Sequence, residues 1–252
     1  MAGARRYKGL GIWTLLLIAT LASSWATGFG LSAFKDWRNM VLFVQGMFPP
    51  RWDLLPDVLG AMGRTLAIAF LGTLIAFLLA FPISFATARN IGPNLLGAGL
   101  RGLLAFLRSI PEIIWALVFL VSLGFGDAAG VMALAVHNLG ILGKLIGETF
   151  EAAPPGPQEA VAAAGAPPAA VVWYGILPWA MPTILSHAFF RFECNIRTAA
   201  VLGVVGAGGI GKMLEVHKAM FQYDAMLVDT LGILALVLLA DGAGSLLRKA
   251  VI

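Results

Sequence analysis

A stripe of polar side chains marks one face of the apolar segment that extends from about residue 171 to residue 205. Its members follow one another at spacings of four, four and three residues: His187, Arg191, Asn195 and Thr198. Positions three and four apart share one face of a helix, and the other residues of this segment are largely apolar. At ~1.5 Å of rise per residue, Arg191 would lie ~20 Å along the helix from Pro178, deep within any membrane that the helix crosses.

Arg191 is the most informative residue of this stripe, because no acid lies on the same face. A guanidinium at membrane depth requires a water-filled path, an anionic substrate or an acidic partner on another helix. Its fork of N–H donors fits the oxygens of phosphonate or phosphate groups. We expect the stripe, together with Arg197, to line a path for an anionic substrate, and pairing between helices is the alternative.

Three pairs of opposite charge lie four residues apart within apolar segments: Arg108–Glu112, Lys144–Glu148 and Glu193–Arg197. This spacing places both members of a pair on one helix face. Charges at membrane depth are costly, so we expect Arg108, Glu112, Lys144, Glu148 and Glu193 to form structural ion pairs. His137 and Asn138 are further candidates for the path, although a single His in a helix is more often a packing residue.

A glycine run from Gly206 to Gly211 fits the pattern G-x-G-x-x-G, which in other proteins binds dinucleotides. That function needs a strand before the run, a helix after it and a surrounding parallel sheet, and an apolar helical segment precedes it here. We therefore expect Gly206, Gly208, Gly209 and Gly211 to end the membrane helix, to turn the backbone tightly and to form part of an outer gate. Residues 212–224 should follow as a short amphipathic helix.

Catalytic and metal-binding patterns are absent from the sequence. His137, His187 and His217 are scattered, the single cysteine, Cys194, cannot build a zinc site alone, and no G-x-x-x-x-G-K-[ST] motif occurs. We expect neither an enzyme nor a chain that binds ATP, a metal or a cofactor itself, so energy for any transport must come from a partner.

The composition places these residues in a membrane. Of the 252 residues, 60% are hydrophobic and only 12% are charged, about half of the ~25% charged residues typical of soluble domains. The mean hydropathy is +0.89 and the net charge is +4. The excess of Lys and Arg is typical of loops held on the cytoplasmic side, and it does not require nucleic acid as a partner.

Six apolar stretches are long enough to predict an all-α, polytopic membrane protein, since a membrane helix needs about 20 apolar residues. Pro82 should kink the second and Pro111 should interrupt the third. The fifth is too long for one crossing, so its start should lie along the membrane and end near Pro178 and Pro182. The stretches cover about residues 10–29, 66–88, 103–125, 128–150, 171–205 and 225–247.

The basic residues near the ends of these spans place both termini in the cytoplasm. The residues that this orientation puts inside are Arg5, Arg6, Lys8, Arg89, Arg101, Arg248 and Lys249. The first span resembles a signal peptide in its basic start, but its apolar part is longer than usual, so we expect a retained anchor. Residues 30–64, with Trp37 and Trp52, should lie at the outer interface.

The loop at residues 151–178 would then lie in the cytoplasm, where Gln158 to Ala166 can form a short Ala-rich helix. Its sequence resembles the EAA loop of ABC importer permeases, in which Glu-Ala-Ala is followed by three residues, Gly, nine residues and Ile-x-Leu-Pro. The positions that match are Glu159, Ala160, Gly165, Leu177 and Pro178; Val161 and Gly175 depart from the pattern.

Segments RSIPEIIWALVF, HNLGILGKLIGE and RFECNIRTAAVLGVVGAGGIG also look like the phosphonate-type permeases, and the resemblance extends from about Leu54 to the C-terminus. It implies a type I ABC permease fold over residues 66–252, preceded by an anchor and interfacial segment at residues 1–65. It also implies a bacterial inner-membrane location and no ATP or Mg site in this chain. The implied partners are a second permease copy, two cytoplasmic ATP-binding subunits that hold ATP and Mg, and an external substrate-binding protein.

The function implied by the resemblance is import of phosphonate or a related phosphorus oxyanion by alternating access. Glu159, Ala160 and Gly165 would transmit the movement of the ATP-binding subunits. Alternatives are a permease of the same class for another small solute, a gradient-driven secondary transporter, or a membrane enzyme acting on lipid phosphate. The sequence shows neither the internal repeat of a secondary transporter nor a catalytic cluster.

Overall fold

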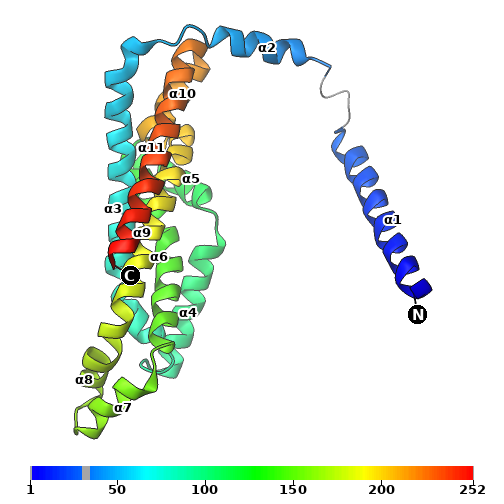
Figure 1. Cartoon of the computed structure of the whole chain (residues 1–252). Coiled ribbons are helices and arrows are strands. Elements are labelled where there is room, and N and C mark those ends of the chain that lie inside the picture. Colours follow the sequence, from blue (N-terminus) through cyan, green and yellow to red (C-terminus); the bar gives the residue numbers. More distant parts are fainter. Residues whose placement is uncertain (1, 30–34, 252) are drawn as a thin grey trace. The chain divides into compact units, whose positions relative to one another are not determined.

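The computed structural model describes residues 2–29 and 35–251, and every regular element within these ranges is helical. The chain separates between Phe48 and Pro49 into two compact units, which are described one at a time (Figure 1). The all-α fold class predicted from the sequence is confirmed.

The first unit contains α1 (Ala2–Thr27) and α2 (Trp37–Gly46). Within α1, the apolar part whose side chains are described runs from Ile12 to Thr27. Its large apolar side chains, among them Leu17 and Trp25, are exposed, as expected of a helix that meets lipid. The start of the predicted interfacial segment, residues 30–34, lies outside the described residues, as do the side chains of Arg5, Arg6, Lys8, Arg248 and Lys249.

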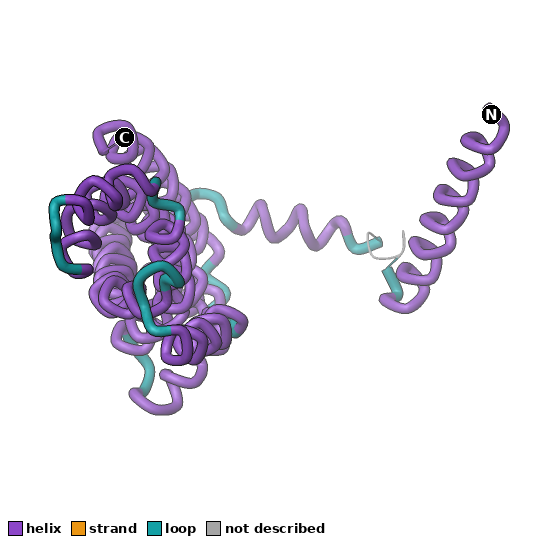
Figure 2. The backbone as a smooth tube through the Cα atoms, turned by 90° about the horizontal axis from the view of Figure 1, so that it is seen from below, coloured by secondary structure: helices purple, strands orange, loops and turns teal. Residues whose placement is uncertain are grey.

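The second unit contains all the remaining helices. They are η2 (Trp52–Leu54), α3 (Leu55–Thr87), α4 (Asn94–Ser109), α5 (Glu112–Leu123), α6 (Asp127–Glu151), α7 (Pro155–Ala163), α8 (Pro168–Ala170), η3 (Val171–Ile176), α9 (Leu177–Leu202), η4 (Gly203–Ala207), α10 (Gly209–Ala219) and α11 (Tyr223–Val251). Figure 2 shows the long helices nearly end-on, joined by short loops.

Among the described residues, four helical stretches are long and apolar enough to cross a membrane, at Trp52–Thr87, Asp127–Glu151, Pro168–Ala207 and Tyr223–Gly244. A fifth crossing arises if α4 and α5 count as one span, although they are bent by 88°. The bend falls at Pro111, where the sequence predicts an interruption, because proline cannot continue the helical hydrogen bonds.

Two predicted boundaries differ from the structure. α3 begins at Leu55, eleven residues before Leu66, since buried Val58 and its neighbours continue the apolar face of the span. The division expected between residues 65 and 66 therefore falls inside a helix. Pro182 lies within α9 without ending it, and Pro178 occupies its first turn, where proline is tolerated.

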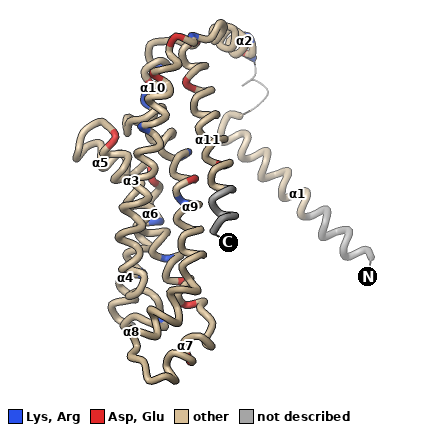
Figure 3. The backbone as a smooth tube through the Cα atoms, turned by 60° about the vertical axis from the view of Figure 1, so that its left-hand side comes forward, with Lys and Arg blue, Asp and Glu red and all other residues tan. Residues whose placement is uncertain are grey.

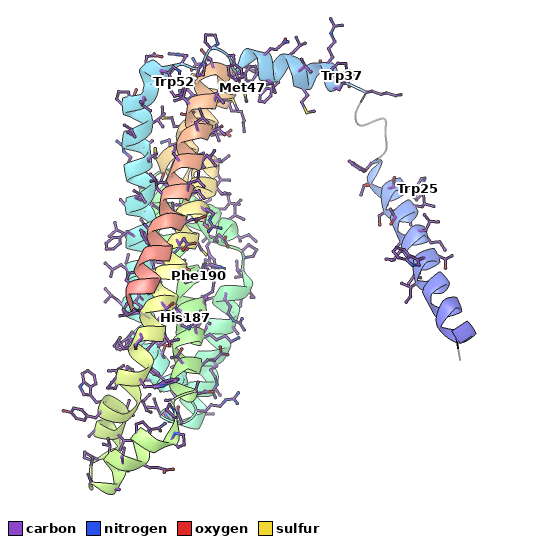
Figure 4. All side chains as sticks on the ribbon, viewed as in Figure 1. Trp25, Trp37, Met47, Trp52, His187 and Phe190 are labelled. Carbon is purple, nitrogen blue, oxygen red and sulfur yellow. The ribbon has the colours of Figure 1, made fainter. Side chains whose placement is uncertain are left out.

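The second unit has two distinct ends. The short helices α7 and α8 lie at one end, and α10 lies with the beginnings of α3 and α11 at the other (Figures 1 and 3). Trp52 lies at the latter end, where α3 begins (Figure 4), and is exposed. Successive spans therefore alternate in direction, which places the loop around Glu159 and the glycine run at opposite ends.

Small residues bring the central helices together. A Cβ atom added to Gly72 of α3 would lie 2.7 Å from Cβ of Leu134 on α6, so the two backbones approach more closely than larger residues permit. Toward the α7 end, Phe85 stacks on the fully buried Phe150 with ring centroids 4.8 Å apart. These contacts fix α3 against α6, the helix that carries His137 and Asn138.

Candidate translocation path and coupling loop

A chain of hydrogen bonds crosses three helices in the middle of the second unit. Arg191 Nε on α9 donates to Asn138 Oδ1 on α6 over 2.6 Å, and Asn138 Nδ2 donates to Asn195 Oδ1 over 2.9 Å. Asn195 Nδ2 donates to Thr73 Oγ1 on α3 over 2.7 Å, and Thr73 donates to the Ala69 carbonyl. Asn138 and Asn195 are fully buried, so this chain satisfies polar groups that would otherwise destabilise the fold.

The terminal nitrogens of Arg191 remain available. Only Nε of this side chain makes a hydrogen bond to another described residue, and the side chain is partly buried. Glu112, which lies against His137 on α6, forms no ion pair with Arg191 in the described part of the chain. Arg191 is thus held in place by Asn138 while its two Nη groups can receive an anion.

The other predicted path residues have different surroundings. His187 lies on α9 one turn before Arg191 and is partly buried. Figure 4 labels His187 and the nearby Phe190 on this helix. Thr198 is partly buried one turn after Asn195. Arg197, by contrast, lies 3.4 Å from Glu193 and 3.0 Å from Asp241 of α11. Those two carboxylates make Arg197 a link between α9 and α11 rather than a free cation.

The predicted pair between Arg108 and Glu112 is not formed among the described residues. The spacing of four residues assumes one continuous helix, and the 88° bend between α4 and α5 separates the two side chains. Glu112 Oε2 lies instead 3.4 Å from His137 Nε2 on α6. His137 Nδ1 lies 3.0 Å from the Ile110 carbonyl, which only accepts, so His137 provides a donor for the end of α4 at the bend.

The other two predicted pairs are present in the structure. Lys144 Nζ lies 3.3 Å from Glu148 Oε1 along the exposed face of α6, and Glu193 pairs with Arg197 as described above. Figure 3 shows charged positions beside α9 in the middle of the bundle as well as at its ends. Both pairs lie on continuous helices, where the spacing rule applies.

The glycine run forms a tight turn at the α10 end. Gly206 has φ of 101°, in the region that favours glycine, and its carbonyl accepts a hydrogen bond from the Gly126 amide over 3.1 Å. Gly211 lies against the Ala200 carbonyl so closely that a Cβ atom would overlap with it. Positive φ also occurs at Gly208 and Gly209. The chain thereby folds back, so that α10 lies against the end of α9. The amphipathic helix predicted for residues 212–224 corresponds to α10, which ends at Ala219.

The loop at residues 151–178 forms α7, α8 and η3 at the other end. α7 covers Pro155–Ala163, three residues earlier at each end than predicted, because Pro155 starts the helix and Gly165, with φ of 79°, follows its end. Glu159 and Ala160 are exposed on α7. Leu177 is buried beneath the loop, and Pro178 is exposed. The short helix thus presents an acid and small side chains at the surface.

The departure from the EAA pattern at Gly175 has a structural reason. A Cβ atom at this position would lie 3.1 Å from Cα of Gln158 on α7, so a larger residue would push α7 away. The surrounding segment Val171–Ile176 is π-helical, and such a turn accommodates an extra residue. Ile176, one position later than the pattern requires, is buried in the core cluster with Leu177.

Thr73 is the one member of the hydrogen-bonded chain that the sequence does not single out. It lies 122 residues from Asn195 in the sequence, in the part of α3 after Arg64, where the polar residues are small hydroxyl side chains. The only sequence signal for Thr73 is its position in the most apolar span, and this signal does not identify a partner.

A family of transport proteins accounts for this arrangement. Residues 72–252 match the model of the binding-protein-dependent transport system inner membrane component. The chain belongs to this permease family. It is therefore a multi-pass inner-membrane subunit of an ABC importer.

Several curated relatives of the permease are transporters of phosphorus compounds. The phosphite transport system permease protein PtxC of Stutzerimonas stutzeri is 41% identical over 250 residues, which cover 96% of this chain and 91% of that protein. The phosphate-import permease protein PhnE of Mycolicibacterium smegmatis is 37% identical over 200 residues, which cover 78% of this chain and 37% of that protein.

A solved structure shares the fold of the permease. The MetNI methionine ABC transporter, in an inward-facing conformation, matches with a TM-score of 0.68 and 25% identity, over 79% of this chain and 98% of that one. The type I permease fold predicted from the sequence is confirmed by this similarity.

Proposed function

We propose that the permease carries phosphite, a phosphonate or a similar small phosphorus oxyanion across the inner membrane by alternating access. ATP hydrolysis by two cytoplasmic partner subunits drives the change, and an external binding protein delivers the substrate. A second copy of the chain completes the path. The similarity to phosphite and phosphate permeases supports this substrate class.

The hydrogen bonding of Arg191 is the observation on which the substrate assignment rests. Its Nε is held by Asn138, and its Nη groups make no hydrogen bond to any other residue in the described ranges. A guanidinium fixed at one nitrogen and open at two others suits two oxygens of a phosphorus oxyanion. Binding of the anion would also compensate the cost of a cation at membrane depth. His187 and Thr198 would line the path further along the same face of α9, and Asn195 acts by supporting Asn138.

The coupling role of the loop is supported by its exposure and its firm attachment. Gln158 Nε2 donates to the Ala153 and Pro154 carbonyls, each over 3.0 Å, and Gly175 packs against the backbone of the same residue. Glu159 and Ala160 therefore sit on a short helix, and Gly165 follows its end. This helix is tied to the residues that follow α6 and packs against η3, which leads into α9. A push on that helix by an ATP-binding subunit would move both spans.

The outer glycine turn is proposed as a gate, because α10 joins several helices. The Ile210 amide donates to Thr65 Oγ1 of α3 over 2.9 Å, and His217 Nδ1 lies 2.6 Å from buried Asp229 of α11. A hinge at Gly206 would let α10 move as a unit when these contacts change. No ATP site is assigned to the chain, since ATP and Mg are bound by the partner subunits.

Reconstitution tests this function. The permease, its ATP-binding subunits and the binding protein are placed in liposomes, and uptake of radiolabelled phosphite is measured. We expect uptake that requires ATP inside and binding protein outside. Uptake by the permease alone along an ion gradient would support the secondary-transporter alternative, and ATP-driven uptake of methionine without phosphite would reassign the substrate.

A further inference from the structure

A second candidate anion site lies away from the proposed path, between the ends of α3 and α6 and the length of α4. The pocket has a volume of about 200 Å³ and is lined by four cations, Arg89, Arg101, Arg108 and Lys144, and by the carboxylates Glu148 and Glu151. We propose that this pocket binds a phosphate-type anion. Its cytoplasmic location rests on the orientation proposed above, whereas the binding itself does not.

The two carboxylates do not neutralise all four cations. Glu148 pairs with Lys144, and Glu151 Oε1 accepts a hydrogen bond over 2.8 Å from the backbone amide of Arg89 rather than from its side chain. Within the described ranges, the guanidinium groups of Arg89 and Arg108 have no protein hydrogen-bond or ion-pair partner. The pocket therefore carries more positive than negative charge, which favours binding of an anion.

The frame of the pocket is rigid. Arg101 Nη1 donates to the Thr87 carbonyl over 2.7 Å and fixes α4 to the end of α3. A Cβ atom added to Gly140 of α6 would lie 2.7 Å from the Leu104 carbonyl of α4, so the two backbones nearly touch. Arg101 and Arg108 are seven residues apart on one face of α4, and the cations therefore line a groove about 10 Å long.

The chemistry of the lining favours a phosphate group. A free guanidinium fork matches two oxygens of a tetrahedral anion, and cationic pockets between membrane helices on the cytoplasmic side bind lipid phosphates. The phosphate can come from the headgroup of an anionic lipid or from free phosphate in the cytosol. The pocket is distinct from the proposed path, because it is lined by none of the hydrogen-bonded residues Arg191, Asn138, Asn195 and Thr73.

Two binding measurements on the purified full-length permease separate these sources. Inorganic phosphate is titrated in phosphate-free neutral detergent while the thermal unfolding midpoint is followed. Native mass spectrometry then counts the lipids retained after incorporation into nanodiscs of phosphatidylglycerol or phosphatidylcholine. The variant Arg89→Gln/Arg108→Gln removes the two free cations. The matched control Arg64→Gln/Lys212→Gln removes two cations from the pocket of about 450 Å³ at the α10 end.

We expect saturable binding of phosphate or selective retention of phosphatidylglycerol by the wild type. This binding should be reduced at least tenfold in Arg89→Gln/Arg108→Gln and unchanged in the control Arg64→Gln/Lys212→Gln. Binding of phosphate in detergent identifies the free anion, and retained phosphatidylglycerol that phosphate does not displace identifies the lipid. If the double variant does not fold, Arg108→Gln alone should still weaken binding severalfold. The proposal is overturned if the wild type binds neither phosphate nor phosphatidylglycerol, or if folded Arg89→Gln/Arg108→Gln binds them as well as the wild type. Neither result bears on ATP-driven uptake.

Discussion

Asn138 on α6 and Arg191 on α9 are joined by a hydrogen bond of 2.6 Å, although 53 residues separate them in the sequence. The bond fixes one edge of the guanidinium and leaves its two terminal nitrogens for an anion. Asn138 is fixed in turn by Asn195 and by the Leu134 carbonyl. The proposed position for an oxyanion is thereby supported by buried groups on two helices.

Arg191→Gln should reduce phosphite uptake by roughly 10- to 100-fold, because hydrogen bonds to a charged group contribute about 1.5–3 kcal/mol. The assembled importer should remain in the membrane at normal levels, as measured by co-purification of the ATP-binding subunits. Asp241→Asn, which removes one partner of Arg197, is the control and should leave uptake close to that of the wild type, since Arg197 keeps Glu193 as a partner. Normal uptake by Arg191→Gln would exclude Arg191 from the path.

Thr73→Val should destabilise the permease by about 1–3 kcal/mol, because Asn195 Nδ2 would lose its acceptor in a buried site. The measurement is the thermal unfolding midpoint of the purified chain. Ser122→Ala is a suitable control, since Ser122 is exposed and bonds only to the Val118 carbonyl within its own helix. An equal midpoint for Thr73→Val and wild type would show that the buried chain does not stabilise the bundle.

Gly211→Ala should impair both assembly and uptake, because its Cβ atom would overlap with the Ala200 carbonyl and push α10 from the end of α9. Gly99→Ala on α4 meets open space and should behave like the wild type. Gly206→Ala should lower the free energy of unfolding by about 1–3 kcal/mol, since alanine rarely adopts a positive φ. Stable, fully active Gly211→Ala protein would argue against close contact between these helices.

Much of the fold follows from apolar length and from proline. The stretches around residues 66–88, 128–150 and 225–247 are recognisable because a membrane requires long apolar helices, and Pro111 marks the bend. The sequence does not reveal that α3 begins at Leu55, because residues 55–65 mix polar and apolar side chains. Val58 holds this part of the helix by packing in a buried cluster with Ile210 of α10 and Val228 of α11, and such packing is a tertiary property.

The candidate site is only partly predictable for a related reason. Spacing along one helix identifies the stripe that contains Arg191, and it identifies Lys144–Glu148 and Glu193–Arg197. The same rule gives the wrong partner for Glu112, since the helix ends between Arg108 and Glu112. Partners on other helices, such as Thr73 for Asn195 and His137 for Glu112, depend on packing that no local spacing encodes.

The proposed coupling requires that an ATP-binding subunit inside the cell binds α7 around Glu159. Cysteine labelling tests this contact most directly. Cys194 is the only cysteine, so Glu159→Cys is made in a Cys194→Ala background and treated with a membrane-impermeant maleimide. We predict labelling in inside-out vesicles, none in right-side-out vesicles, and protection when the ATP-binding subunits are bound. Labelling from the outside, or labelling that the bound subunits do not reduce, would contradict the account.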